Sequence, residues 1–384
     1  MSRRGGFLLA SYAFVVVMYG TTLPTPLYPL FQQRYGFGEL MVTVIFAIYS
    51  FGVIAGLLAF GALSDVIGRR PVLAAGIAFA AASALLFIFA GSLAPIYVAR
   101  VLSGLSAGIF TGTATAALVD LAPRGNRRLA TLVAVIANLG GLGLGTLGAG
   151  LLADYASSPL RLPFIVDLGL LTFAGAALWA TPESVERRHF RLQLQRLSVP
   201  EEVRSVFIQS AAAGFGIFAV AGVYSSVAPA FLGIYLHHTS HTLAGGLVTI
   251  LFATSVAGQV LVPRLGERAA LIVGCLLVIA GVGLTALALG IDSLATLIAA
   301  SVVVGLGQGV VIGAGLAAIN QRAPVERRGE TASSFFVVMY VGLSIPVIGV
   351  GVAAHYWNLP DAGIVFSIAV AALVAAVLVS LARR

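Results

Sequence analysis

Long apolar runs separated by short polar turns extend over almost the whole chain. Each run has about 20 residues or more, the length that a helix needs to cross the hydrocarbon core of a bilayer. The pattern therefore predicts an all-α membrane protein with twelve transmembrane helices. We place these helices near residues 7–30, 41–62, 72–91, 95–119, 130–152, 162–181, 207–231, 243–263, 269–290, 294–319, 332–353 and 363–381. Pro24, Pro26 and Pro29 in the first helix and Pro229 in the seventh predict breaks or kinks there.

The apolar pattern repeats. Residues 41–47 (MVTVIFA) return as 247–253 (LVTILFA), and glycines at 104, 108 and 112 return at 305, 309 and 313. We therefore predict two pseudo-symmetric halves of six helices each, residues 1–181 and 207–384, joined by a polar linker at 182–206. Duplicated halves of this kind place a substrate site at their interface, near the middle of the membrane.

Composition and charge agree with this fold. Hydrophobic residues make up 59% of the chain, charged residues 9%, and the mean hydropathy is +1.04. The chain has no lysine, and every arginine except Arg34, Arg100 and Arg161 falls on one side of the predicted helices. The positive-inside rule then places both termini in the cytoplasm. The net charge of +8 belongs to membrane anchoring and gives no reason to expect a nucleic-acid partner.

A charged turn, residues 61–73 (GALSDVIGRRPVL), lies between the second and third helices. Its glycines permit a tight turn, and Asp65 lies one helical turn before Arg69. Asp120, at the end of the fourth helix on the same side, is placed to pair with Arg69 or Arg70. An ordinary topology anchor is the alternative for any single residue here. The conformational latch that we predict consists of Gly61, Asp65, Gly68, Arg69, Arg70 and Asp120.

Two ionisable residues inside helices are candidates for proton coupling or an electrostatic gate. Arg100 stays charged, so it needs a partner, an aqueous cavity, or a position from which it snorkels to the surface. Asp167 is either a proton-carrying carboxyl or a residue at the membrane boundary. Neutral polar residues predict a substrate cavity, although each is also able to pin two helices together. They are Tyr19, Thr22, Asn138, Tyr224, Gln308 and Tyr340.

The chain offers little for other chemistry. Cys275 is the single cysteine, which excludes intramolecular disulfides. The histidines at 237, 238 and 241 lack a further ligand, so we expect a polar loop and no metal site. We find no catalytic or nucleotide-binding motif, and we predict neither an enzyme nor a cofactor.

The charged turn, in a chain of twelve helices and two repeated halves, resembles the signature loop of the Major Facilitator Superfamily, and the resemblance covers essentially the whole chain. Residues 100–108 (RVLSGLSAG) and 141–150 (GLGLGTLGAG) are similar to the fourth- and fifth-helix motifs of its drug/proton antiporter branch. Thr146 replaces the proline of the second motif, and Ala149 one of its paired glycines. The small residues that we expect at helix contacts are Gly104, Gly108, Gly141, Gly145 and Gly150.

The resemblance implies alternating access, with the latch closing the cytoplasmic side against residues 329–333. The matching turn of the second half, residues 259–268, is degenerate, with Pro263 in place of the acid. We expect a proton-coupled exporter of small hydrophobic or amphiphilic compounds, acting as a monomer in a bacterial inner membrane. The alternatives are a proton-coupled uptake symporter for a sugar or organic acid, and a receptor without transport activity. The partners implied are protons, a small-molecule substrate and the lipid bilayer.

Overall fold

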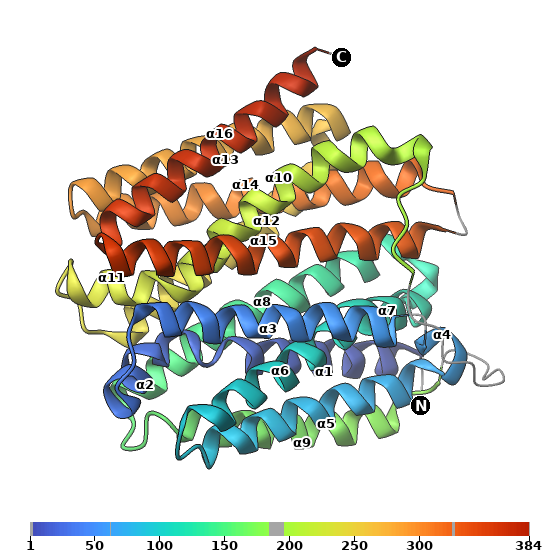
Figure 1. Cartoon of the computed structure of the whole chain (residues 1–384). Helices are drawn as coiled ribbons and strands as arrows, with labels where there is room; N and C mark the ends of the chain where they lie inside the picture. The colour runs from blue at the N-terminus through green and yellow to red at the C-terminus, as the bar shows by residue number, and fades with distance from the viewer. Residues whose placement is uncertain (1–2, 62, 184–195, 325–326, 384) are drawn as a thin grey trace. The chain divides into compact units, whose positions relative to one another are not determined.

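The computed structural model describes residues 3–61, 63–183, 196–324 and 327–383 (Figure 1). Every regular element in these residues is helical, and twelve spans are long and apolar enough to cross a membrane. The predicted all-α fold with twelve spans is confirmed. The spans are Arg3–Tyr35, Glu39–Phe60, Arg69–Ile88, Leu93–Asp120, Arg127–Tyr155, Leu162–Ala180, Glu201–Ser226, His241–Leu265, Glu267–Gly290, Leu294–Arg322, Arg328–Tyr356 and Leu359–Ala382.

The chain divides into two compact units. Unit 1 comprises Met1–Phe31 and Ile48–Arg196, and unit 2 comprises Gln32–Ala47 and Leu197–Arg384. The division passes through helix α3 (Glu39–Phe60), so that its first residues group with unit 2. Residues 184–195 of the predicted linker lie outside the described residues, and α10 already begins at Glu201. Glu201 and Glu202 in the first turn suit the positive end of that helix dipole.

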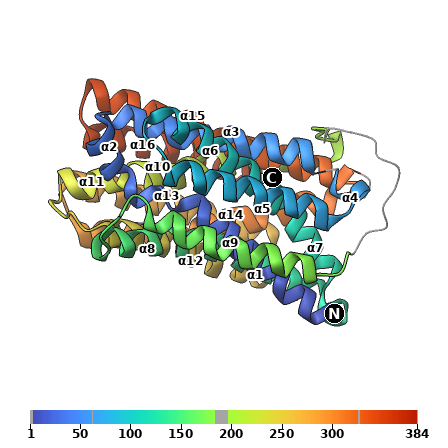
Figure 2. The ribbon, with the colours of Figure 1, turned by 90° about the horizontal axis from the view of Figure 1, so that it is seen from below.

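Unit 1 carries the charged turn and both intramembrane ionisable residues of the prediction. Helices α5 and α9 pack side by side, as do α5 and α6, and α1 packs on α8 and α9 (Figure 2). Besides part of α3, its elements are α1 (Arg3–Thr22), η1 (Thr25–Leu27), α2 (Tyr28–Tyr35), α4 (Ser64–Ile67), α5 (Arg69–Ile88), α6 (Leu93–Ile109), η2 (Phe110–Ala114), α7 (Thr115–Asp120), η3 (Pro123–Gly125), α8 (Arg127–Tyr155) and α9 (Leu162–Ala180); α2 continues into unit 2.

Unit 2 has the same kind of arrangement, in which α14 packs on α10, α12 and α13, and α16 packs on α13 and α15. Its core includes the buried aromatic residues Phe207 and Phe335, whose rings meet edge to face at 6.4 Å between centroids. Its helices are α10 (Glu201–Ser226), α11 (Ala228–Ile234), α12 (His241–Leu265), α13 (Glu267–Gly290), α14 (Leu294–Arg322), α15 (Arg328–Tyr356) and α16 (Leu359–Ala382).

Breaks in the spans lie where prolines predict them. The first span changes from α1 to a short 3₁₀ turn at Thr25–Leu27, with Pro24 and Pro26 at the change. The predicted seventh helix, residues 207–231, breaks between α10 and α11, where Pro229 stands in the first turn of the new helix. The fourth span contains a π-helical turn, Phe110–Ala114, which the sequence did not predict. Single π-helical turns inside α-helices are rare and are often found at functional sites.

Glycines allow α3 and α6 to cross with their backbones in contact. A Cβ atom on Gly104 would overlap the carbonyl oxygen of Tyr49 and lie 2.9 Å from the Cα atom of Gly52. A Cβ atom on Gly108 would overlap the carbonyl oxygen of Val53. Small residues at four-residue spacing permit this close approach in membranes, where van der Waals packing drives helix association. This crossing fixes the position of α6, which carries Arg100.

Candidate functional site

The charged turn forms a compact polar cluster at one end of unit 1. The short helix α4 ends at Ile67, Gly68 follows it, and α5 begins at Arg69. Gly68 has φ +105°, which glycine adopts without the steric conflict that a Cβ atom would introduce. A side chain there would also contact the carboxylate of Glu183. The glycine predicted at this place therefore has two structural reasons.

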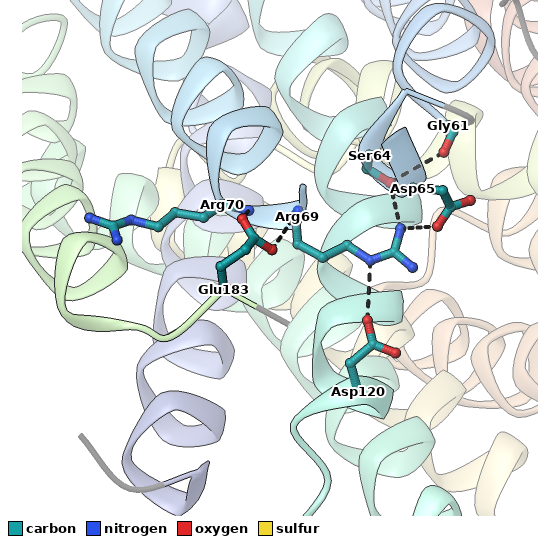
Figure 3. A network of polar contacts seen from close by, with 7 residues as sticks. All are labelled: Gly61, Ser64, Asp65, Arg69, Arg70, Asp120 and Glu183. Atoms are coloured by element: carbon teal, nitrogen blue, oxygen red, sulfur yellow. Dashed lines mark hydrogen bonds and ion pairs between the residues drawn. The ribbon is translucent and has the colours of Figure 1, made fainter. Parts of the chain in front are cut away.

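Arg69 is the centre of the cluster (Figure 3). Its Nη1 atom lies 2.5 Å from Oδ1 of Asp65 and donates to Oγ of Ser64 at 2.7 Å. Its Nε atom donates to Oδ2 of Asp120 at 3.2 Å. The structure thus brings together three predicted latch residues from α4, α5 and α7. Because the side chains of Asp65 and Asp120 are 64% and 33% exposed, water screens these ion pairs.

Glu183 is a member of this cluster that the sequence prediction missed. Its Oε1 atom accepts a hydrogen bond from the backbone N–H of Arg69 at 2.9 Å, and its Oε2 atom accepts one from the N–H of Arg70 at 3.1 Å. These N–H groups are two of the unpaired donors at the start of α5. Two arginines at a helix N-terminus oppose the helix dipole, and the Glu183 carboxylate offsets them. Glu183 therefore caps the helix from a different part of the chain.

Replacing Glu183 tests this cap. We expect Glu183→Ala to lower the stability of the protein by about 1 kcal/mol, because it leaves two helix N–H groups without their acceptor. Glu183→Gln keeps one acceptor oxygen and should have an intermediate effect. Thermal unfolding of the purified variants in detergent measures the order. Equal unfolding temperatures for wild type and Glu183→Ala would contradict the capping role.

Arg70 does not join the ion pairs of Arg69. In Figure 3 its side chain extends away from Asp65 and Asp120. Its guanidinium carbon lies 4.9 Å from the ring centroid of Trp179 in α9, a cation–π distance. Of the two neighbouring arginines, only Arg69 therefore has its side chain in the predicted latch.

Unit 2 carries an ion pair of opposite polarity at the corresponding place. Nη1 of Arg322, in the last turn of α14, lies 2.9 Å from Oε2 of Glu267, the first residue of α13. In unit 1 the arginine begins the third span and the acid ends the fourth, whereas in unit 2 the acid begins the ninth span and the arginine ends the tenth. Both charges of unit 2 suit their helix dipoles. The degenerate turn thus also lies beside an ion pair, although Pro263 stands where the turn of the first half has its acid.

Arg100 lies inside the helix bundle of unit 1. Arg100 is 2% exposed. Its Nη1 atom donates to the backbone oxygen of Thr21 at 2.9 Å, and its guanidinium carbon lies 4.5 Å from the ring centroid of Tyr49. A snorkelling position is therefore excluded. A backbone carbonyl and an aromatic face both favour the cation, as a buried guanidinium requires. The charge joins α6 to α1 and α3.

Asp167 of α9 is also 2% exposed, so it lies inside the helix bundle of unit 1. Its carboxyl lies against Gly20 of α1, where a Cβ atom would be 2.6 Å from Oδ2. Among the residues that the structure describes, nothing donates a hydrogen bond to its Oδ1 atom. A cavity of about 10 Å³ adjoins the carboxyl and is also lined by Thr21, Ser83 and Ser103. This volume is at the lower limit for one water molecule.

The carboxyl and the guanidinium are linked through two consecutive residues of α1. Gly20 contacts Asp167, and the carbonyl of Thr21 accepts the hydrogen bond of Arg100. Transfer of an ionised carboxylate from water to an apolar interior is strongly unfavourable without compensating hydrogen bonds. Binding of a proton to Asp167 would therefore remove a negative charge from the side of α1 that also contacts Arg100.

The glycine-rich part of α8 packs on α1. Cβ atoms on Gly141 and Gly145 would contact the backbone of α1, and Gly150 is buried. The hydroxyl of Thr22 donates to the carbonyl of Leu142 at 2.7 Å across the same contact. Thr146, in place of the proline of the related motif, donates to the carbonyl of Gly143, and α8 stays helical throughout. Four of the five predicted packing glycines thus serve two contacts, Gly104 and Gly108 that of α6 with α3, and Gly141 and Gly145 that of α8 with α1.

The six residues predicted for a substrate cavity are divided between the units. Tyr19, Thr22 and Asn138 belong to unit 1, and the other three belong to unit 2. Tyr224 is buried and its hydroxyl lies 2.9 Å from that of Thr285, a bond between α10 and α13.

Tyr340 and Gln308 are the other members of the set in unit 2. Tyr340 meets Phe218 edge to face at 5.6 Å, and Gln308 is 2% exposed with no donor to its Oε1 atom in the described part of the chain. The hydroxyl groups of Thr22 and Tyr224 connect helices. A substrate role remains a proposal for this set.

Some of the missed residues had a weak signal in the sequence. Glu183 follows the sixth span directly, at the start of an otherwise arginine-rich linker, on the same side as the charged turn. Tyr49 lies three residues before Gly52, which recurs in the second half as Gly258, each glycine five residues after the repeated segment. Gly20 and the carbonyl of Thr21 had no signal, because only packing makes them partners.

Comparison with known proteins agrees with the fold. The model of the Major Facilitator Superfamily matches residues 10–347. An uncharacterised MFS-type transporter of Methanocaldococcus jannaschii is 20% identical over 348 residues, which cover 88% of each chain. A putative multidrug resistance protein, MdtD of Salmonella typhi, is 25% identical over 250 residues, 64% of this chain and 53% of MdtD. The match thus spans about half the length of MdtD.

Solved transporter structures share the fold. The nucleoside transporter NupG superposes with a TM-score of 0.76 at 11% identity and covers 99% of each chain. A bacterial homologue of the human lysosomal transporter Spinster, inward-facing and unoccupied, has a TM-score of 0.73 at 14% identity, covering 99% of this chain and 97% of its own. The match to the family model over residues 10–347 indicates a multi-pass membrane transporter of small molecules and not an enzyme. The chain belongs to the Major Facilitator Superfamily.

Proposed function

We propose that this transporter couples proton movement to the export of small hydrophobic or amphiphilic compounds by alternating access. The observation that carries the proposal is the buried carboxyl of Asp167, which contacts Gly20 of α1, one residue before the Thr21 carbonyl that accepts the hydrogen bond of Arg100. A carboxyl in this position is neutral with a proton and attracts the guanidinium without one. Proton binding then changes the relative stability of two arrangements of α1, α6 and α9.

The ion pairs of Arg69 have the role of a latch in this proposal. A contact that is formed in one state and broken in the other shifts the equilibrium by its free-energy difference between the states. Exposed pairs are worth about 0–1 kcal/mol each, which suits a contact that must open in every cycle. The charged turn lies on the arginine-rich side, which we propose to be cytoplasmic, together with both termini.

Replacing Asp65 should affect cycling more than stability. We expect Asp65→Asn to lower the turnover rate while substrate affinity stays near wild type, with a stability change below about 1 kcal/mol. Flux and binding measured on the same preparation separate the two effects. Glu202→Gln, at an exposed position of α10, serves as the control. Unchanged turnover in Asp65→Asn would refute the latch.

Export is favoured over uptake by the resemblance of α8 to the antiporter motif and by the similarity to MdtD, a putative multidrug resistance protein. The spans also carry few of the amide and tryptophan side chains that suit a sugar. An uptake symporter remains the second candidate, because Arg100 is a potential carboxylate ligand and Asp167 would serve proton symport equally. The two functions differ in the direction of transport.

Inverted vesicles that are acidified inside test the proposal. With ethidium and tetraphenylphosphonium as probes, we expect the compounds to accumulate and protons to leave the vesicles. Accumulation in whole cells, driven by the same gradient, would favour the symporter instead. If no lipophilic compound of a broad panel releases protons, the exporter proposal fails. We further propose that the protein acts as a monomer in a bacterial inner membrane, which its mass in lipid nanodiscs would test.

A further inference from the structure

Arg70, unlike Arg69, borders an open groove between α5 and α9. The groove measures about 340 Å³ and is lined by Arg70, Pro71, Ala74, Leu178, Trp179 and Glu183. Its walls are mainly apolar, and its charged residues lie where α5 begins and α9 has just ended. An apolar groove with charge at one end suits an amphiphile whose head lies at that end.

Trp179 leaves the donors of Arg70 available. The ring is 77% exposed and lies beneath the guanidinium at 4.9 Å. A guanidinium that stacks on an indole still presents its N–H groups at the edge of its plane, in the geometry that phosphate oxygens accept. No carboxylate among the described residues forms an ion pair with this guanidinium. The Glu183 carboxylate is occupied by the backbone N–H groups of α5.

Position along the membrane supports a lipid as the occupant. Tryptophan is enriched where a bilayer meets water, and arginines attract the anionic lipids of the cytoplasmic leaflet. Pro71, Ala74 and Leu178 continue the groove along the two helices that span the membrane. An acyl chain fits this apolar path, whereas a free phosphate ion would use only the charged end.

We propose that this groove binds one anionic phospholipid, with the headgroup phosphate on the edge of the Arg70 guanidinium and an acyl chain along Trp179, Leu178 and Ala74. The lipid then bridges the start of α5 and the end of α9, next to the cap that Glu183 provides. This site is independent of the proposed substrate and of proton coupling.

Trp179 makes the site observable. The chain has two tryptophans, so Trp357→Phe leaves Trp179 as the single one. The full-length variant is reconstituted into phosphatidylcholine vesicles that contain brominated phosphatidylglycerol, and brominated phosphatidylcholine and phosphatidylethanolamine are compared at equal mole fraction. Bromine on the acyl chain quenches a neighbouring indole. We expect brominated phosphatidylglycerol to associate with Trp179 about fivefold more strongly than the other two lipids.

Variants separate Arg70 from general surface charge. Arg70→Gln should abolish the preference, whereas Arg128→Gln, an exposed arginine of α8, should preserve it. Arg70→Lys is the second variant, for use if Arg70→Gln does not fold. It keeps the charge without the planar guanidinium, so we expect it to retain a reduced preference for phosphatidylglycerol.

Three results would overturn the proposal. They are equal quenching by the three brominated lipids in the Trp357→Phe protein, an unchanged preference in folded Arg70→Gln, and release of the lipid by millimolar inorganic phosphate. The last result would indicate a general phosphate site.

Discussion

Asp167→Asn is expected to exchange substrate across a membrane at constant pH but to lose all accumulation driven by a pH gradient. Asparagine has nearly the same shape as the acid and fits the same place against Gly20. It cannot bind and release a proton, so the electrostatic balance around Arg100 no longer depends on pH. The variant therefore behaves as though the proton were permanently bound.

Three measurements on proteoliposomes test this expectation. Counterflow of labelled substrate reports exchange, accumulation under an imposed pH gradient reports coupling, and a pH-sensitive dye reports proton release on substrate binding. Asp154→Asn, which replaces an exposed carboxyl of α8, should behave as wild type in all three. Full gradient-driven accumulation by Asp167→Asn would remove Asp167 from the coupling mechanism. Loss of exchange as well would indicate a structural role only.

Gly104→Ala is expected to destabilise the protein by about 1–3 kcal/mol, in the range of overpacked cores. The new methyl group would overlap the carbonyl oxygen of Tyr49, which belongs to the backbone and has no rotamer by which to move away. Helices α3 and α6 must therefore separate. Separation also moves the Tyr49 ring away from Arg100, so we expect transport to fall together with stability.

Gly112→Ala in the same span is the matched control. A Cβ atom there would find its nearest neighbour, Cδ2 of Leu57, at 3.9 Å, which is an ordinary contact. We expect this variant to unfold in detergent at a temperature equal to or above that of wild type, since alanine favours helices over glycine. Equal unfolding temperatures for Gly104→Ala and Gly112→Ala would show that the crossing of α3 and α6 adjusts without strain.

The motif of the charged turn predicted an ion pair with Asp120 but not which of two arginines forms it. The turn predicted the pairing of Asp120 with one of two neighbouring arginines, and the structure selects Arg69. Spacing could not make this selection, because consecutive helical residues point about 100° apart and the azimuth of α5 depends on its packing. The same azimuth directs Arg70 to Trp179 and the lipid groove.

The ion pair of the second half was also missed in the sequence. The loss of the acid at position 263 made its turn look degenerate, yet Glu267 and Arg322 form an ion pair between the ends of α13 and α14. A search for the same residue at the same place misses a pair whose polarity is exchanged. The physical requirement is a pair of opposite charges across two helix ends, and either order satisfies it.

The fold class and the number of spans follow from the amino-acid sequence alone. In a bilayer every backbone N–H and C=O group must find an internal partner, so apolar runs of this length have the helix as their solution. Prolines located the breaks in the first and seventh predicted helices, because they lack an N–H group. These outcomes depend on local chemistry, which the sequence carries in full.

Which residues are partners depends on how the helices pack. It joined Asp167 to Gly20, Arg100 to the carbonyl of Thr21, and Glu183 to the start of α5. Gly20 and the backbone groups of Thr21 and Arg69 have no chemistry that a sequence pattern displays. Their roles arise when packing brings distant helices together and leaves a buried charge or a helix end in need of a partner.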